Sequence, residues 1–289
     1  MPPFELPPLA TDTHVHLFDP ASFPYAEGRR YTPPPATVAD LQQVHRALGV
    51  ERVVLVQPSV YGFDNACLLD GLAQLGDRAR GVAVIKEGTT RDELLRLYQV
   101  GVRGVRLNVE VAGRTDAPAC AEALRTMDDA LEDIPMLVQL YAPVEVTLAC
   151  SDVIRAMSRP VLIDHFGLVR ASVAGQVNSL PQLIELMGGA NVWIKLSGPH
   201  QISSDTPNYR DVAPIARAFW DAAPDRSVWG SDWPHTGGTS RPKDALAEQV
   251  ESFRLVDDQQ QLGLVAQWVP DEWARRELMV SNPERLFGF

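Results

Sequence analysis

Residues 11–17 read TDTHVHL, and this short stretch decides how the rest of the chain is interpreted. Its apolar and β-branched residues are typical of a strand, and His14 and His16 stand two positions apart near its end. Because side chains alternate along a strand, both imidazoles point to one side while Val15 and Leu17 point to the other. Two imidazoles on one side can ligate a metal or polarise one oxygen atom, so the stretch predicts a strand that ends in a functional site.

Two further apolar runs end on polar residues much later in the chain: PVLIDHFG contains His165, and SVWGSDWPH contains Asp232. By strand alternation we expect His165 to share a side with Val161 and Ile163, and Asp164 to point the other way. Polar residues at the ends of separate strands meet if those ends converge on one mouth. A parallel β/α barrel gathers its functional groups in this way, at the carboxyl ends of its strands.

Runs rich in Val, Ile and Leu recur along the chain, as expected of parallel strands that are buried on both faces. We expect strands at 11–17, 52–57, 81–86, 104–109, 136–141, 161–165, 192–197 and 227–232. Between them lie helix-like stretches, among them 37–48, 91–100, 119–132, 144–157, 209–223 and 243–254. This alternation favours an α/β fold, a (β/α)8 TIM barrel, over a doubly wound sheet. The barrel would be a single domain, 1–289, with a short proline-rich N-terminal lead-in.

Composition narrows the class of protein further. The chain has 289 residues, 45% of them hydrophobic and 22% charged, which is ordinary for a soluble globular protein. We find no apolar run long enough for a membrane span, no signal peptide and no CxxC pair among Cys67, Cys120 and Cys150, so we expect a cytoplasmic protein with reduced thiols. The net charge of −11 argues against nucleic acid as a partner but not against a small anionic substrate. The oligomeric state stays open.

Several polar residues near the expected strand ends are candidates for substrate binding. Arg106 and Asn108 share strand parity and would face the mouth, and Arg103 and Arg210 lie close to strand 4 and after strand 7. Guanidinium groups bind carboxylates through paired hydrogen bonds, although surface salt bridges are the alternative. Further candidates for the pocket are Tyr31, Gln57, Ser59, Tyr141 and His235, of which the last either orients its loop or contacts substrate. Lys86 and Lys195, at the ends of strands 3 and 7, are candidates for a buried ion pair.

Taken in order, the motifs HVH at 14–16, DHFG at 164–167, WGSDWPH at 229–235 and NPERLFGF at 282–289 resemble the amidohydrolase superfamily. The chain is most similar to its 2-pyrone-4,6-dicarboxylate lactonase-like branch, and RRYTPPPAT, VQPSVYGFDN, ARGVAVIK, GVRGVRLN and YRDVAPIAR also resemble segments of that branch. The resemblance runs from about Asp12 to the end. It implies a TIM barrel, hydrolysis of a lactone that often carries carboxylates, and arginines that hold those carboxylates.

The chain departs from the metal-binding pattern of many members of that superfamily. The expected strand 5 reads VQLYAP, with Gln139 and Tyr141 but no histidine, and strand 4 reads GVRLNVE, without a bridging lysine. We therefore do not expect a centre with two metal ions. A single zinc or manganese ion on His14, His16, His165 and Asp232 stays open. The lactonases that the sequence resembles imply that no metal is required, and we favour that interpretation.

The leading hypothesis is a lactone hydrolase with Asp232 as the general base for water. His14, His16 and His165 would polarise the carbonyl and stabilise the oxyanion. One alternative keeps the fold but makes the protein a metal-dependent amidohydrolase or decarboxylase. Another is a non-catalytic barrel that binds a carboxylate, which the presence of a candidate general base disfavours.

Overall fold

The computed structural model describes residues 4–109, 116–171, 179–237, 246–269 and 271–289. Its eight strands form one parallel sheet in which each strand lies beside the next in chain order, which confirms the predicted barrel. The strands are β1 (Thr11–Val15), β2 (Arg52–Val56), β3 (Ala79–Ala83), β4 (Val102–Asn108), β5 (Leu137–Tyr141), β6 (Val161–Ile163), β7 (Val192–Ser197) and β8 (Ser227–Gly230).

The barrel closes where the chain leaving β8 meets β1. The Asp232 backbone N–H donates to the His14 carbonyl at 3.0 Å, and the His16 N–H donates to the Trp233 carbonyl at 2.9 Å. Lower down, the Thr13 hydroxyl donates to the Trp229 carbonyl at 2.7 Å. These bonds place the ends of the first and last strands side by side, although they are more than 200 residues apart in the chain.

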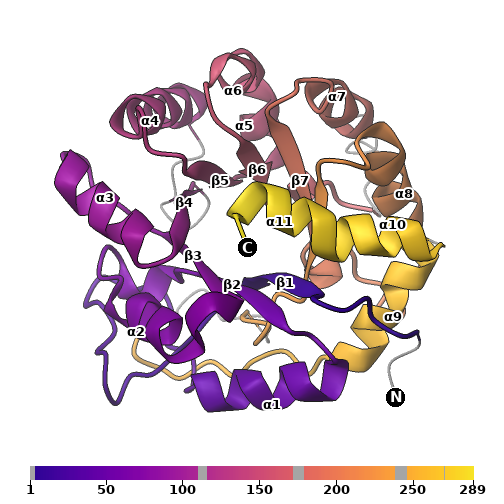
Figure 1. Cartoon of the computed structure of the whole chain (residues 1–289), viewed down its shortest axis with the longest axis horizontal. Coiled ribbons are helices and arrows are strands. Elements are labelled where there is room, and N and C mark those ends of the chain that lie inside the picture. The colour runs from indigo at the N-terminus through magenta and orange to yellow at the C-terminus, as the bar shows by residue number, and fades with distance from the viewer. Residues whose placement is uncertain (1–3, 110–115, 172–178, 238–245, 270) are drawn as a thin grey trace.

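Helices surround the barrel, and the last of them crosses one of its ends (Figure 1). The helices are α1 (Val38–Leu48), α2 (Ala66–Leu75), α3 (Arg91–Gln99), α4 (Ala117–Ala130), α5 (Val144–Ala149), α6 (Ser151–Ala156), α7 (Ser179–Leu186), α8 (Ala213–Ala222), α9 (Asp258–Trp268), α10 (Glu272–Arg276) and α11 (Asn282–Phe287). The expected start of the first helix is confirmed, because Thr37 and Asp40 form a capping box there.

Two helix predictions need correction. The stretch 144–157 is divided into α5 and α6, which meet at Cys150. No helix covers 246–254, the described part of the predicted helix 243–254. There the chain runs beside the loop after β1, where the Glu251 N–H donates to the Thr32 carbonyl at 2.8 Å. The helix begins later, at α9, whose first backbone N–H groups bind the Asp257 side chain.

The interior of the barrel and the layer outside it are both apolar. Inside, a cluster of buried residues fills the part of the barrel toward the amino-terminal ends of the strands: Val54, Val56, Val82, Leu137, Leu162, Trp193, Val228 and Phe287. A larger buried cluster lies between the strands and the surrounding helices. Phe287 comes from α11, the helix that crosses this end of the barrel (Figure 1), and its ring packs in the interior cluster at the amino-terminal ends of the strands. This packing leaves the carboxyl-terminal end for polar residues.

The three cysteines are free and buried, as expected of reduced thiols. No helix among the described residues is both long and apolar enough to cross a membrane.

Candidate active site

A cavity of about 280 Å³ lies at the mouth of the barrel, which is the carboxyl-terminal end of its strands. The structure brings many of the predicted site residues to its wall: His16, Tyr31, Ser59, Arg106, Asn108, Tyr141, His165 and Asp232. Residues that were not predicted also line it: Gln201, Thr236, Glu251 and Arg254. The carboxyl-terminal end of the barrel is therefore the candidate active site, as the strand-end pattern predicted.

His14 of β1 and His16, the first residue after this strand, lie on one side, and their Nε2 atoms are 3.2 Å apart. His16 Nδ1 lies 2.7 Å from the Val56 carbonyl oxygen, which can only accept, so Nδ1 carries the proton. Burial and then the charge of Arg106 lower the pKa of His16 to about 4, so this imidazole is neutral near pH 7. His14 does not line the cavity among the described residues but lies behind His16.

His165 and Asp164 both reach the site, which corrects the prediction that they point to opposite sides. Strand β6 ends at Ile163, and the chain leaves it with a φ of 48° at His165. This left-handed backbone is uncommon for a residue other than glycine and turns the imidazole toward the mouth. Ser197 Oγ lies 2.9 Å from His165 Nδ1 and holds the ring. The Asp164 side chain points toward the interior of the barrel, as the alternation of side chains along β6 predicts.

Asp232 sits between imidazoles, and its backbone also has a left-handed φ, 67°. Its Oδ1 lies 3.7 Å from His14 Nε2 and 3.9 Å from His165 Nε2. Its Oδ2 lies 3.1 Å from His200 Nε2 and accepts from Gln201 Nε2 at 3.2 Å. Burial would raise the pKa of Asp232, but His165, His200 and His14 hold it well below its ordinary value. The carboxylate is therefore ionised and held by partners on both oxygens.

A buried ion pair lies below the histidines. Lys195 Nζ is 3.2 Å from Asp164 Oδ1, and both side chains are fully buried. Gln139 joins them, because its Oε1 accepts from Lys195 at 3.0 Å and its Nε2 donates to Asp164 Oδ2 at 2.9 Å. Burial would raise the pKa of Asp164, but Lys195 and then His14 hold it well below its ordinary value. The expected buried pair is thus formed by Lys195, whereas Lys86 is exposed.

Arg106 is the arginine that faces the cavity from the predicted strand. It donates from Nη1 to the Gln57 carbonyl at 3.3 Å, and its Nη2 lies 3.7 Å from Asp164 Oδ2. Its buried Nε has no hydrogen-bond partner within the described ranges. Arg254 also lines the cavity, and its Nε is likewise buried without a partner among the described residues. Two arginines with unused N–H groups make this cavity suited to an anion.

The structure does not bring the other predicted arginines to the cavity. Arg103 lies at the amino-terminal end of β4, where it donates to the carbonyls of Tyr98 and Val102 and stacks on the Tyr98 ring. Arg210 is 75% exposed and pairs with Asp205, with Nε 3.2 Å from Oδ2. Strand position explains the first error, because Arg103 and Arg106 lie toward opposite ends of the same strand. Arg210 forms a surface salt bridge, which was the alternative to substrate binding for this residue.

His235 and Gln57 contact neighbouring segments rather than this cavity. His235 Nε2 lies 2.9 Å from Asp258 Oδ1, so the histidine fastens the loop after β8 to the start of α9. That is the loop-orienting role that the sequence left open for it. Gln57 donates from Nε2 to the Asp64 carbonyl at 2.6 Å and lines a neighbouring cavity.

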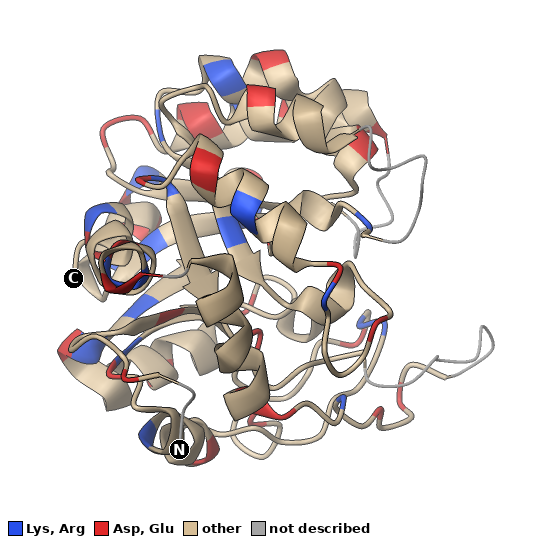
Figure 2. Cartoon of the chain, turned by 90° about the vertical axis from the view of Figure 1, so that its right-hand side faces the viewer, with Lys and Arg blue, Asp and Glu red and all other residues tan. Residues whose placement is uncertain are grey.

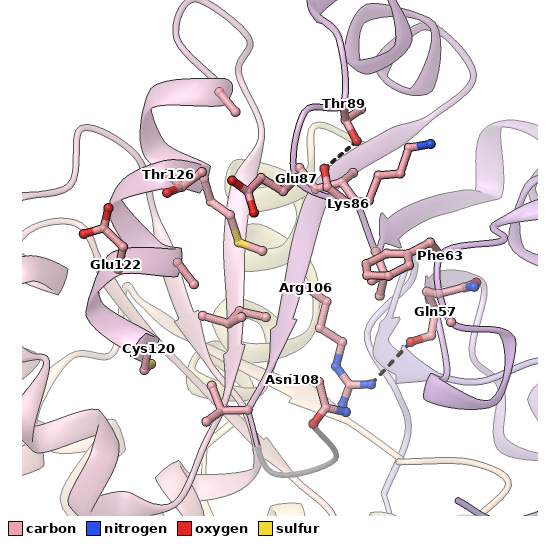
Figure 3. Close-up of a pocket in the computed structure, with 18 of the residues that line it drawn as sticks. Gln57, Phe63, Lys86, Glu87, Thr89, Arg106, Asn108, Cys120, Glu122 and Thr126 are labelled. Atoms are coloured by element: carbon pink, nitrogen blue, oxygen red, sulfur yellow. Dashed lines mark hydrogen bonds between the residues drawn. The ribbon is translucent and has the colours of Figure 1, made fainter. Parts of the chain in front are cut away.

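This neighbouring cavity, about 770 Å³ in volume, lies between α4, the carboxyl end of β4 and the segments that follow β2 and β3 (Figure 3). Phe63, Leu107 and Met127 contribute apolar surface, and Lys86 and Glu87 contribute charges. It shares Ser59, Arg106 and Asn108 with the smaller cavity, so the two adjoin at Arg106. The candidate catalytic residues Asp232 and His165 belong to the smaller cavity alone.

Sequence reasoning missed His200 and Arg254. His200 stands in a loop after β7 that the sequence marked as long, and a polar residue three positions beyond a strand end was the available signal. Arg254 carried no such signal, because it falls more than 20 residues beyond β8 in a stretch that was predicted to be helical. Only the folding of this stretch back against the loop after β1 places Arg254 at the mouth.

The ligand atoms of His14, His16 and Asp232 lie within 4.8 Å of one another, which makes them able to hold one metal ion. Two atoms that each bind zinc at roughly 2.0–2.2 Å are at most about 4.4 Å apart, so the separations of 3.2 and 3.7 Å fit. His165 does not share a group with His16 and Asp232, so the predicted four-residue set does not form as one site among the described residues. The residues present thus fit a single ion by spacing.

The fold and the site define a TIM barrel whose functional groups lie at the carboxyl ends of the strands. A family model described as amidohydrolase matches residues 11–289. The chain is 38% identical over 288 residues to a 4-sulfomuconolactone hydrolase of Rhizobium radiobacter, covering 99% of this chain and 92% of the relative. It is 32% identical over 297 residues to a 2-pyrone-4,6-dicarboxylate hydrolase of Comamonas testosteroni, covering 99% and 92%.

Solved structures agree with these matches. A ligand-free crystal structure of an Agrobacterium tumefaciens protein aligns with a TM-score of 0.82 at 26% identity, covering 100% of this chain and 99% of that one. Because the family model covers nearly the whole chain, the chain belongs to the amidohydrolase family. The resemblance drawn from its motifs is confirmed.

Proposed function

We propose that this protein hydrolyses a lactone that carries anionic groups, such as a 2-pyrone-4,6-dicarboxylate-like or sugar-acid lactone. One observation carries the proposal: the ionised carboxylate of Asp232 shares a cavity with Arg106 and Arg254, whose Nε groups are unpaired among the described residues. A general base and anion-binding groups on one wall suit the hydrolysis of an anionic ester. Relatives named for sulfonated and dicarboxylated lactones support the same substrate class.

In the proposed mechanism, Asp232 accepts a proton from water while the water oxygen attacks the lactone carbonyl carbon. If the Ser197 hydroxyl donates to Nδ1, His165 keeps its proton on Nε2 and donates to the developing oxyanion. The ring C–O bond then breaks, and Asp232 returns the proton to the leaving oxygen. The products are a hydroxyl or enol and a carboxylic acid, which releases its proton to water and becomes a carboxylate near pH 7. Arg106 and Arg254 bind the anionic substituents and fix the orientation of the ring.

His14 has a different role in this proposal from the one expected of it. Because it lies behind His16, it does not donate to the carbonyl but holds His16 in place. Gly230 allows this close packing, since a Cβ at this position would lie 2.8 Å from the His14 Cβ and 2.9 Å from its backbone nitrogen. The carbonyl-polarising role therefore falls to His165.

We further propose that the reaction does not require a metal ion. The support is that hydrogen bonds within the protein already occupy the imidazole nitrogens of His14 and His16. The alternative is one zinc or manganese ion held by His14, His16 and Asp232, whose spacing fits it. Such an ion would polarise the carbonyl and lower the pKa of water when bound. The expectations of a cytoplasmic location and of no nucleic-acid partner stay predictions.

The deciding experiment combines a substrate screen with one substitution. Mono- and dicarboxylated lactones are mixed with protein that was prepared with or without a chelator, and ring opening is followed by absorbance. Asp232→Asn should lower kcat by about 10²- to 10⁴-fold on the best substrate, because it removes the general base. Asp205→Asn, on a loop at the same end of the barrel but paired with exposed Arg210, is the matched control and should keep wild-type turnover.

Near-normal turnover by folded Asp232→Asn would contradict the assignment of the base. Loss of activity with the chelator, restored by stoichiometric zinc or manganese, would favour the metal alternative. Tight binding of a lactone without ring opening would favour a non-catalytic barrel.

A further inference from the structure

Lys195 is a fully buried lysine on β7, in contact with His14 of β1 and behind the His14–His16 pair. Its ammonium group has two hydrogen-bond partners, His14 Nδ1 at 3.0 Å and Gln139 Oε1 at 3.0 Å, and forms an ion pair with Asp164, whose Oδ1 lies at 3.2 Å. An ammonium group has three N–H donors and no acceptor, so it can only donate in these contacts. The proposed mechanism gives this residue no role, although a buried charge is costly unless it is paired.

The ammonium group determines which nitrogen of His14 carries the proton. Because Lys195 can only donate, His14 Nδ1 must accept, and the neutral imidazole then carries its proton on Nε2. His16 has its proton on Nδ1, bonded to the Val56 carbonyl, so its Nε2 accepts from His14 at 3.2 Å. The hydrogen bonds thus run in one direction, from Lys195 through both histidines to the backbone.

This direction opposes the binding of a cation between the histidines. A metal ion needs a lone pair on each Nε2 atom, but the His14 Nε2 carries a proton while Lys195 donates to the opposite nitrogen. The ammonium charge of Lys195 also lies on the far side of the His14 ring from the position that the ion would occupy, so it repels the ion. We propose that Lys195 keeps the affinity of His14, His16 and Asp232 for divalent metal ions low.

Asp164 shows what the site would become without this lysine. Its Oδ1 lies 3.5 Å from His14 Nδ1, the same atom to which Lys195 donates. With the ammonium group removed, His14 can carry its proton on Nδ1 and donate it to Asp164. Its Nε2 atom then has a lone pair on the side of His16. A histidine that ligates a metal commonly donates its other N–H to a carboxylate in this way. The ligand spacing is already that of a single-ion site, so the lysine is the main obstacle to metal binding.

The test measures metal affinity without substrate, so its result is independent of the lactone assignment. Wild-type protein, Lys195→Met, Lys195→Gln and Lys195→Arg are stripped with a chelator and titrated with zinc against a chromogenic competitor at constant pH. Lys195→Met and Lys195→Gln should bind zinc roughly 10- to 100-fold more tightly than wild type, the size of effects on metal affinity from such outer partners. Lys195→Arg keeps the charge and should stay weak.

Lys86→Met is the matched control, because it removes the same charge from a lysine that lies outside this site. Its zinc affinity should equal that of wild type. Equal or weaker binding by folded Lys195→Met and Lys195→Gln would overturn the proposal. Nitrogen-15 spectra of metal-free wild-type protein decide the matter if these variants do not fold. His14 should be protonated at Nε2, and a proton found at Nδ1 instead would overturn the proposal.

Discussion

The two ends of the barrel use the same residue types for opposite purposes, and β4 shows this within one strand. Arg103, near its amino-terminal end, donates to backbone carbonyls and stacks on Tyr98. Arg106, three residues later, reaches the mouth and retains a buried Nε without a partner among the described residues. The structure thus satisfies an arginine at one end and leaves one available at the other. On β4, an unused donor rather than charge alone distinguishes the arginine at the mouth from the arginine at the closed end.

The amino-terminal end is closed by the end of the chain. Figure 2 shows α11 and the C-terminus on the left, opposite the long loops at the mouth. Phe287 fills the interior, while Arg52 and Arg80 lie over the ring of Phe289 at 4.9 and 4.8 Å. Apolar packing therefore provides stability at this end, and buried polar groups provide chemistry at the other. Four predictions test whether the two ends are separable in this way.

The largest expected effect is on stability at the closed end. Phe287→Ala should lower the free energy of unfolding by about 3–5 kcal/mol, because it empties a fully buried site inside the barrel. Phe289→Ala is the control, since that ring is partly buried and should cost only about 1 kcal/mol. Urea unfolding followed by circular dichroism measures both. A loss below about 1 kcal/mol for Phe287→Ala would mean that α11 is not a structural plug.

At the mouth, Arg106→Met should raise KM for a carboxylated lactone by about 10- to 100-fold. Charge-assisted hydrogen bonds of the kind lost are worth about 1.5–3 kcal/mol. Steady-state kinetics on lactones with and without carboxylates provide the measurement. The uncharged lactone is the internal control, because its KM should change much less. Equal increases for both lactones would show that Arg106 shapes the cavity rather than binding an anion.

Stability should depend on pH through the histidines of the mouth. The pKa of His16 is about 4 in the folded protein and about 6.5 when unfolded, so the unfolded state binds more protons between these values. Stability is therefore complete above pH 6.5 and is lost as the pH falls toward 4. Between pH 7 and pH 5 we expect this group to cost on the order of 2 kcal/mol.

The measurement is urea unfolding of wild type and His16→Asn at both pH values. The variant should lose less stability than wild type on acidification, because its position 16 does not titrate. An equal loss in the two proteins would show that the burial of His16 does not disfavour its protonation.

The smallest expected effect comes from Arg103→Met. This side chain donates to backbone carbonyls and stacks on Tyr98 at the amino-terminal end of β4, away from the cavity, so kcat/KM should stay within about twofold of wild type. Its stability should fall by about 1 kcal/mol, the net value of a typical hydrogen bond. A change in KM as large as that of Arg106→Met would contradict the conclusion that the two ends of the barrel serve separate purposes.

Much of the fold and part of the site were predictable from local pattern. Eight apolar runs indicated eight strands, and the HVH spacing correctly put His14 and His16 on one side. His165 reached the site for a reason that strand alternation does not contain, namely a left-handed turn just beyond β6. Arg254 was unpredictable, because the loop that carries it is positioned by contacts with residues far away in the chain, such as Thr32.

The sequence by itself determined the barrel, because the alternation of apolar strands and amphipathic helices allows few other ways to bury those faces. It also determined that polar residues would gather at the strand ends. Only the tertiary structure decided how these residues act on one another. His14 and Lys195 are 181 positions apart, yet their contact at 3.0 Å assigns a proton to one nitrogen of an imidazole. A pattern of residues specifies which groups meet, but hydrogen-bond direction depends on their distances and orientations in space.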